Sequence, residues 1–391
     1  MRISIIDGFR GFFLIFMMVV HANEFLKTTI GKLNHHYFGW VEDAQGFVFL
    51  SGLVVGLVYG GILIRKGQPA MDKAIWRRMK TIYLHQAGLI LILAIAAMAA
   101  TALGLKLGYL APYANAPAAF TLASLGLVTG SAHMGILPMY ILFLLFTPFV
   151  LRWLRLGYLP AVVTGSLCLW LFAQTGLSDT AVDTMESTLN DHGYRLHLGI
   201  FFNVAGWQLI FFAGLCAGYL KAAGELDLGW MHRPGVARAF AVAACAILLL
   251  GLYDRVVFDF WISHSYSDHV LDVTDRGNLS TIYAVAFFLD LFAIVWLLVA
   301  GPQSSLPGIA LGARVMTTIF TWKPLVFLGQ HSLHVFSAHI LCVYALELYF
   351  LNAEPGRLAA NIAILLSPLP LFAAAWGHAR MQATGGKPVA A

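Results

Sequence analysis

Long apolar stretches separated by short polar segments make up most of the sequence. Ten of them hold about 18 to 25 residues, enough for an α-helix rising about 1.5 Å per residue to cross a hydrocarbon layer about 30 Å thick. We place the predicted spans at 5–25, 44–64, 81–103, 133–151, 160–177, 203–220, 236–257, 280–300, 325–349 and 358–377. The pattern predicts an all-α, polytopic integral membrane protein with about ten transmembrane helices, forming a single domain over residues 1–391.

The first apolar segment is predicted to stay as a span rather than to be removed as a signal peptide. It carries Asp7 and Arg10, is too long for the apolar region of a signal peptide and lacks a small-residue cleavage site after it. With the N-terminus in the cytoplasm, the outer segments hold few of the 24 basic residues: Lys27, Lys32, Lys106, Arg195, Arg255, Arg276 and Arg357. This bias follows the positive-inside rule, so we predict that both termini are cytoplasmic.

Composition supports the membrane class. Hydrophobic residues make up 60% of the chain and charged residues 11%, too few polar side chains to cover a water-soluble globule. The four cysteines lie in apolar runs without C-x-x-C spacing, so we interpret them as small buried residues. No Walker A, G-x-G-x-x-G, G-x-S-x-G or H-E-x-x-H motif occurs, which argues against nucleotide hydrolysis. The lipid bilayer is the expected surrounding, no nucleic-acid partner is expected, and a homo-oligomer is compatible with the sequence.

Two long polar connections, 178–202 and 258–279, are predicted on the outer side. Both mix acidic residues with histidines and aromatic residues. Such loops suit a polar acceptor such as a glycan, and they equally suit a solvated acidic surface.

The first span carries a polar stripe. Asp7 and Arg10 are one turn apart, and His21 returns to nearly the same helix face. His21 lies about 16 Å along the axis from Arg10 at about 1.5 Å per residue, deep in or across the membrane. Because burying an ionisable group in a bilayer is costly, we favour a catalytic or gating role for His21 over a core histidine. Asp7 and Arg10 either belong to that site or anchor the inner interface.

A basic segment precedes the third span. It reads W-R-R-M-K-T-I-Y-L-H and contains Arg77, Arg78, Lys80, Tyr83 and His85. Such a cluster attracts phosphate groups, and a positive-inside anchor or a lipid headgroup contact explains it equally well.

Other polar positions in or beside the spans are candidates for binding the acceptor or supporting the site: Glu42, Gln45, Ser51, His133, Tyr140, Trp207, Gln208, Ser332 and His339. Gly52, Gly56 and Gly60 form a ladder that favours close helix packing. The ninth span has several histidines, but neither neighbouring carboxylates or cysteines nor the i, i+4 spacing of a helical zinc site, so no metal is expected.

Several motifs together resemble one family. I-D-G-F-R-G (6–11) followed by His21 resembles the first span of acyltransferase-3 membrane enzymes. The chain resembles the OpgC branch more closely. Five motifs carry this resemblance: F-V-F-L-S-G (47–52), R-R-M-K-x-x-Y-x-H (77–85), H-M-G-I-L-P-M-Y (133–140), W-Q-L-I-F-F-A-G (207–214) and L-G-Q-H-S-L-H-V-F (328–336). These matches occur in order over most of the chain.

The resemblance implies transfer of a succinyl group to osmoregulated periplasmic glucans, in the bacterial inner membrane. It implies His21 as the catalytic residue, Asp7 and Arg10 as the conserved first-span pair, and Arg77 with Lys80 as the acyl-CoA-binding R-x-x-R. The expected co-substrate is succinyl-CoA or acetyl-CoA, with no permanently bound cofactor. This chain departs from the family pattern at Gln45, Gly135 and Tyr283, where the pattern has an acidic residue, Asp and Arg.

A membrane transporter is the alternative. In that case Asp290, which is alone in the eighth span, would form a proton or substrate pathway with His21 and the ninth-span histidines. The span pattern has no two-fold repetition, which argues against this class.

Overall fold

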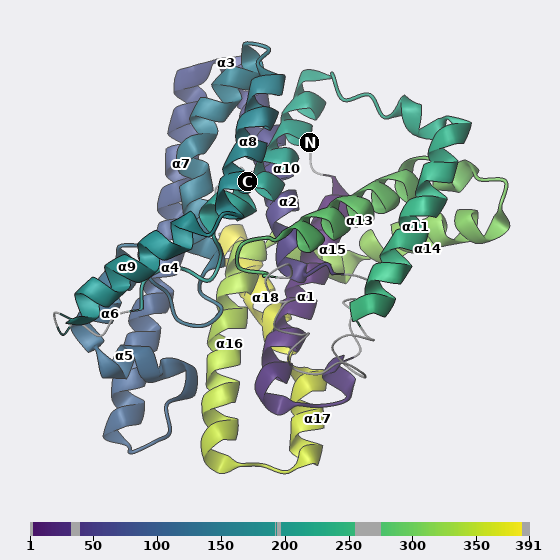
Figure 1. Ribbon diagram of the computed structural model, residues 1–391. Coiled ribbons are helices and arrows are strands. Elements are labelled where there is room, and N and C mark those ends of the chain that lie inside the picture. Colours follow the sequence, from purple (N-terminus) through teal and green to yellow (C-terminus); the bar gives the residue numbers. More distant parts are fainter. Residues whose placement is uncertain (1–2, 33–39, 192, 194–196, 255–274, 385–391) are drawn as a thin grey trace.

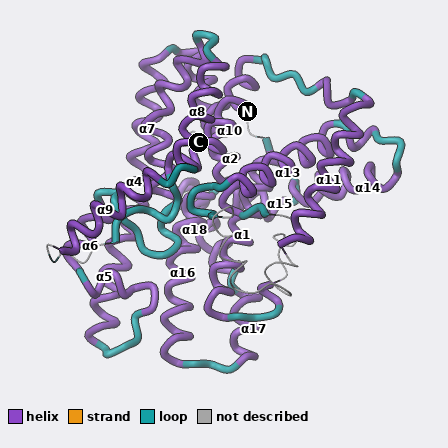
Figure 2. Tube along the Cα trace, in the orientation of Figure 1, coloured by secondary structure: helices purple, strands orange, loops and turns teal. Residues whose placement is uncertain are grey.

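The computed structural model describes residues 3–32, 40–191, 193, 197–254 and 275–384. Its described residues are helical apart from loops and one isolated β-bridge between Thr129 and Gly199 (Figures 1 and 2). Residues 255–274, which include most of the second predicted acidic loop, lie outside the described part. The predicted all-α, multi-span architecture is confirmed.

The longer helices carry the spans. They are α1 (Ser4–Leu26), α2 (Asp43–Val55) continued through a π-helical turn (Gly56–Gly60) into α3 (Gly61–Lys66), α4 (Gln68–Ala102), α7 (Ile136–Arg155), α8 (Leu159–Ala173), α9 (Leu177–Asp191), α10 (Val204–Ala223), α11 (Pro234–Asp254), α13 (Thr281–Val299), α16 (Ser332–Ala353), α17 (Arg357–Leu366) and α18 (Leu369–Thr384). Shorter helices connect them: η1 (Ile30–Lys32), η4 (Gly108–Leu110), α5 (Ala111–Asn115), α6 (Pro117–Leu125), η5 (Gly229–His232), η7 (Gly301–Gln303), α14 (Pro307–Phe320) and α15 (Lys323–Gln330).

Nine helices of the described part are long and apolar enough to cross a membrane, and a bent pair makes a tenth. That pair is α8 and α9, which meet at 52°. The predicted span 160–177 is therefore shorter than expected. The outer segment 178–202 also differs from an irregular loop, because its first part forms the polar helix α9.

Glycines allow two helix pairs to pack closely at the centre. A side chain at Gly52 or Gly56 would meet the backbone of α10, at the carbonyls of Phe211 and Leu215. In the same way, Gly329 of α15 lies against the backbone of Asp7 in α1. Small residues let helix backbones approach, and van der Waals packing then holds the pair together. The glycine ladder predicted for the second span therefore serves packing.

Helix α1 lies beside α15 and α16 in the middle of the molecule, while α2, α7, α8 and α10 form a bundle beside them (Figure 1). The outward surface is strongly apolar: Leu91, Ile95 and Met98 on α4 and Val242 and Leu249 on α11 are more than 48% exposed. An apolar surface of this extent fits a lipid environment.

The cysteines correct one expectation. Cys216 is buried and Cys342 half-buried, but Cys168 on α8 and Cys245 on α11 are exposed. Both exposed cysteines lie on helices whose outer surfaces are apolar, so their thiols belong to the surface that we assign to lipid rather than to the core.

Candidate active site

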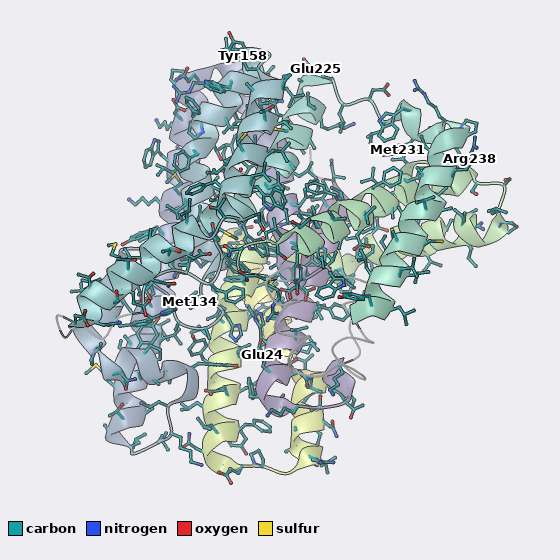
Figure 3. All side chains as sticks on the ribbon, in the orientation of Figure 1. Glu24, Met134, Tyr158, Glu225, Met231 and Arg238 are labelled. Carbon is teal, nitrogen blue, oxygen red and sulfur yellow. The ribbon has the colours of Figure 1, made fainter. Side chains whose placement is uncertain are left out.

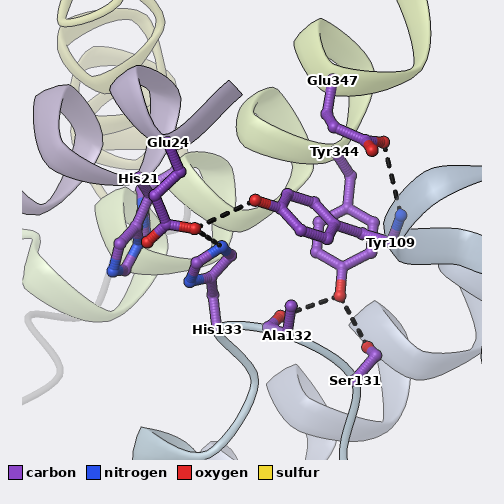
Figure 4. A network of polar contacts seen from close by, with 9 residues as sticks. His21, Glu24, Tyr109, Ser131, Ala132, His133, Tyr344 and Glu347 are labelled. Atoms are coloured by element: carbon purple, nitrogen blue, oxygen red, sulfur yellow. Dashed lines mark hydrogen bonds and ion pairs between the residues drawn. The ribbon is translucent and has the colours of Figure 1, made fainter. Parts of the chain in front are cut away.

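Two histidines from distant parts of the chain meet His21. Its Nδ1 lies 2.9 Å from Nε2 of His339 on α16, and its ring stacks on that of His133 with the centroids 3.9 Å apart. His339 is fully buried. Helix α1 supplies His21, α16 supplies His339, and the loop before α7 supplies His133, so the three rings join separate elements of the fold. Figure 4 shows His21 and His133 side by side.

His133 has an unusual backbone. Its φ is +63°, in the left-handed region that side chains other than glycine rarely adopt, although histidine tolerates it better than most. Burial of its ring lowers the pKa of His133 to about 4, so the imidazole is neutral at physiological pH. Strained backbone of this kind persists where surrounding contacts determine it, and often at functional sites.

Contacts with α16 hold the His133 loop in place. The hydroxyl of Tyr344 donates to the Ser131 Oγ at 2.7 Å and to the carbonyl of Ala132 at 2.8 Å. Figure 4 shows these bonds beside His133, on the loop segment that precedes it. The loop that carries His133 is thereby tied to the helix that carries His339.

A carboxylate and a phenol lie beside the three histidines. Glu24 Oε2 lies 3.4 Å from His133 Nε2 and accepts a hydrogen bond of 3.0 Å from the Tyr109 hydroxyl. Burial and the neighbouring carboxylate of Glu24 raise the pKa of Tyr109, which therefore stays protonated. Glu24 is 46% exposed and forms the open side of the group. We call His21, Glu24, Tyr109, His133 and His339 the outer histidine cluster.

The outer histidine cluster has donor atoms suited to a metal ion, since those of His21, Glu24 and His133 lie within 4.8 Å of one another. However, the His21 and His133 rings are stacked with an interplanar angle of 24°. The lone pair of an imidazole lies in the ring plane, so stacked rings direct their lone pairs side by side rather than at one point. We therefore describe the group as a hydrogen-bonded cluster, and the absence of a metal stays a prediction.

A narrow cavity of about 30 Å³ lies near the other end of α1. Its polar lining comes from Arg10, Ser51, Arg78, Tyr140 and Ser332. Arg10 donates to the Ser332 Oγ at 2.6 Å, and its guanidinium lies 5.7 Å from the centre of the Phe47 ring. Two arginines therefore line one small space, and their positive charges would attract an anion there.

The basic segment of α4 is divided between two surfaces. Arg78 lines the cavity, whereas Arg77 and Lys80 are exposed and contribute nothing to its wall. Tyr83 is also largely exposed, and its hydroxyl donates to the carbonyl of Leu125. Arg77 and Lys80, which the resemblance matches to a donor-binding pair, are thus directed away from the cavity that holds Arg10.

His85 belongs to a second histidine group. It contacts the Ser337 hydroxyl at 2.9 Å and the ring of His334, which stacks on His378 at 3.5 Å between centroids. His331 Nδ1 in turn lies 2.8 Å from His378 Nδ1. His331 and His334, the other histidines of the predicted ninth span, therefore lie in this second group and not beside His21.

Several predicted acceptor residues have structural roles. Gln45 accepts a hydrogen bond from the backbone N–H of Glu42 and donates to the carbonyl of Tyr283. Glu42 caps the start of α2 and forms an ion pair of 2.8 Å with Arg276. Trp207 donates to the carbonyl of Arg276 at 3.0 Å. These residues join α2 and α10 to the segment before α13, and the Glu42–Arg276 pair lies close enough to Glu24 to interact with it electrostatically.

Gln208 is also structural, because its side chain exchanges hydrogen bonds with Ser166 of α8. Asp7 is buried at the contact of α1 with α15. Asp290 lies on α13, which packs mainly against α11 and α14 and contributes no residue to the outer histidine cluster or to the cavity.

The departures from the family pattern fit their surroundings. Gln45 and Tyr283 contact one another through a side-chain amide and a backbone carbonyl. A Cβ atom at Gly135 would lie 3.1 Å from the ring of Phe202, so a larger residue there would require this ring to move.

Glu24, Tyr109 and Tyr344 were missed by sequence reasoning. For Glu24 a signal existed, since it follows His21 by three residues and therefore lies on the same helix face. Tyr109 and Tyr344 offered none, because only the tertiary fold brings their segments together.

Comparison with known proteins identifies the family. A family model described as OpgC protein matches residues 2–383, nearly the whole chain. A search of curated proteins and a search of solved structures each gave no match. A match over nearly the whole chain shows that the protein belongs to the OpgC family.

Proposed function

We propose that this chain is an acyl-CoA-dependent O-acyltransferase of the bacterial inner membrane. It modifies a periplasmic glucan, and succinyl is the acyl group that it moves from cytoplasmic acyl-CoA to a glucan hydroxyl. Membership of the OpgC family supports glucan modification, and the apolar spans support a multi-pass membrane protein.

One observation carries the proposal: a single helix joins two different polar sites. Arg10 of α1 faces the cavity with Arg78, and His21 of the same helix is in the outer histidine cluster. The two positions are about 16 Å apart along the helix at about 1.5 Å per residue. An enzyme whose charged donor and sugar acceptor lie on opposite sides of a membrane needs two such sites.

Arg10 and Arg78 suit the donor. The donor carries phosphates, and guanidinium groups bind phosphate through paired, charge-assisted hydrogen bonds. Most other residues of the cavity wall are apolar, Phe47, Ile136 and Phe336 among them, and the cavity of about 30 Å³ would have to widen to admit the donor. An apolar wall is suited to the uncharged pantetheine arm as it extends from the phosphates toward His21.

His21 suits the transfer step as a general base. Its Nε2 takes the proton of the attacking hydroxyl, the hydroxyl oxygen bonds to the thioester carbonyl carbon, and the carbon–sulfur bond breaks. The released thiolate then takes a proton, which returns His21 to its neutral form. Histidine suits this exchange because its ordinary pKa is close to neutrality.

The proposal is tested with purified protein in lipid nanodiscs. The protein is incubated with radiolabelled succinyl-CoA or acetyl-CoA and a β-glucan, and label bound to the glucan as an alkali-labile ester is counted. We expect labelled ester with succinyl-CoA. An absence of glucan-bound label with both donors would reject the acyltransferase assignment.

The same assay separates the transporter alternative. Asp290→Asn removes the charge on α13, on which a transport pathway would depend, and we expect it to acylate glucan at the wild-type rate. CoA should also raise the melting temperature of the wild-type protein, because a ligand that binds only the folded state stabilises that state. Wild-type protein that transfers no label to glucan and that CoA does not stabilise would favour the transporter, whereas loss of transfer in Asp290→Asn alone would make Asp290 part of the acyltransferase.

A further inference from the structure

Helices α1 and α16 make two matched polar contacts. Arg10 bonds to Ser332 toward one end, and His21 meets His339 toward the other. The two helices run in the same direction beside each other (Figure 1). The polar stripe of α1 is therefore matched by a stripe on α16, and His339 is the member of that second stripe that touches the ring of His21.

His339 is confined on all sides. It is fully buried, so its ring exchanges no hydrogen bond with bulk water. Its Nε2 is 2.9 Å from His21 Nδ1, and the ring also interacts with the backbone carbonyl of Phe336, one turn earlier in α16. That second contact is poorly directed, since Nδ1 has no partner of full hydrogen-bond geometry within the described residues.

Because Nε2 of His339 faces His21, Nδ1 is the ring nitrogen nearer the carbonyl of Phe336, and this carbonyl favours a proton on Nδ1. A lone pair on Nδ1 would face the lone pairs of the carbonyl oxygen, whereas an N–H there meets an acceptor. A neutral imidazole carries one proton, so a proton on Nδ1 leaves Nε2 as an acceptor. His21 must then donate its own Nδ1 proton to His339, which leaves Nε2 of His21 with the lone pair that a base requires.

We propose that His339 is the positioning residue of His21, acting as an uncharged hydrogen-bond acceptor that fixes the tautomer and orientation of the catalytic ring. One hydrogen bond joins His21 Nδ1 to His339 Nε2, and the carbonyl of Phe336 lies beside the ring of His339. In hydrolytic triads a carboxylate performs this task. An imidazole performs it here without adding a charge to the interior of a membrane protein, where a charge is costly.

Stacking completes the restraint. The hydrogen bond to His339 fixes rotation of the His21 ring within its plane, and the His133 ring fixes its tilt by covering one face at 3.9 Å. Glu24 and Tyr109 lie on the other side of His133, where they bond to each other rather than to His339. This inference rests on the proposed acyl transfer, because it assigns a base role to His21.

Two substitutions separate positioning from packing. His339→Phe keeps a planar ring of similar volume but removes the acceptor, whereas His339→Gln places an amide oxygen where Nε2 stood. We expect kcat to fall about 100-fold in His339→Phe, with KM for succinyl-CoA unchanged, as for loss of a group that orients a reactive one. His339→Gln should recover kcat to within about tenfold of wild type. His197→Phe, on an exposed outer position, is the control.

The results that would contradict the positioning role differ from those that would contradict the proposed function. If His339→Phe runs at the wild-type size and melting temperature and keeps wild-type kcat, or if His339→Gln is as slow as His339→Phe, the positioning role is wrong. Wild-type protein without any transfer would instead reject the proposed function. Independently of activity, ¹⁵N spectra of histidine-labelled protein at pH 8 should show neutral Nδ1–H rings, and the signal of one of them should be lost in His21→Ala. Spectra with only Nε2–H rings would overturn the assignment.

Discussion

At the scale of single residues, His133 combines a left-handed backbone with a buried, uncharged ring stacked on His21. Neighbouring bonds from Tyr344 hold its loop rigidly, so the ring has little freedom to move. We conclude that His133 shapes the environment of His21 rather than exchanging protons itself.

Acid should therefore destabilise the protein through His133. The unfolded chain binds a proton here as the pH falls through about 6.5, but the native ring, with its pKa lowered to about 4, does not. Between these values the unfolded state holds more protons, so the free energy of unfolding falls with decreasing pH, by up to about 3 kcal/mol for this group. Melting temperatures from pH 7.5 to 4.5 test this.

His133→Asn is the matched variant for that series, because asparagine tolerates a left-handed backbone and does not titrate. We expect its melting temperature to decline less with acidity than that of wild type. Parallel pH curves for the two proteins would contradict the account of His133.

The two neighbouring arginines of α4 provide a second test. Arg78 lines the cavity and Arg77 is exposed. Loss of a charge-assisted hydrogen bond costs about 1.5 to 3 kcal/mol, so Arg78→Gln should raise KM for acyl-CoA about tenfold or more. Arg77→Gln should leave KM unchanged. An equal effect of both substitutions would mean that the donor binds the exposed surface of α4 instead.

Sequence reasoning succeeded at this scale along one helix and failed across helices. Helical spacing alone placed Arg10 and His21 on one face, and the structure gives both of them polar partners. Spacing also suggested that Arg77 and Lys80 act together, but only tertiary packing shows that Arg78 reaches the cavity. The partners of His21 come from segments more than 100 residues away, which no local pattern can identify.

At the scale of helices, α2 and α10 pack with their backbones in close contact. Gly52 and Gly56 lie against the backbone of α10, while Gly214 and Gly218 lie against that of α2. This contact holds α2, which carries the cavity residues Phe47 and Ser51, against the rest of the bundle.

A methyl group at this contact should loosen the bundle. Gly56→Ala places a Cβ against the backbone of Leu215 and Tyr219, which cannot withdraw as a flexible side chain would. We expect it to destabilise the fold by about 1 to 3 kcal/mol, as overpacking does. Gly88→Ala on α4, where a Cβ meets nothing within 4 Å, is the control. Equal melting temperatures for the two variants would contradict the packing argument.

Hydropathy predicted the helices well, because each span must satisfy its backbone hydrogen bonds internally and so forms a continuous apolar helix. It failed where a helix is polar or broken. The acidic segment that forms α9 carries no apolar signal, and the ninth span divides at His331 into α15 and α16. Hydropathy averages over such a break and does not detect it.

At the scale of the whole molecule, helices α1 and α16 connect two polar sites, the cavity that Arg10 lines and the outer histidine cluster. Figure 3 labels Glu24 near the outer histidine cluster and Glu225 at a distant end of the bundle, after α10. The distribution of basic residues predicts that Glu225 is cytoplasmic, so the outer histidine cluster is directed toward the periplasm.

Single-cysteine labelling tests this orientation. In a variant without the four native cysteines, Asn115→Cys and Glu225→Cys place exposed thiols at the predicted outer and inner ends. A membrane-impermeant maleimide should label position 115 in intact spheroplasts and position 225 only after lysis. The reverse pattern would invert the topology and place the outer histidine cluster on the cytoplasmic side.

The most direct measurement is acyl transfer by His21→Ala in membranes. Equal amounts of correctly inserted wild-type protein, His21→Ala and the exposed control His197→Ala receive labelled succinyl-CoA and glucan. Loss of a general base costs about 10²- to 10⁴-fold, so His21→Ala should lose at least about 99% of the initial rate while His197→Ala retains it. A His21→Ala protein that acylates glucan at the wild-type rate would contradict the account.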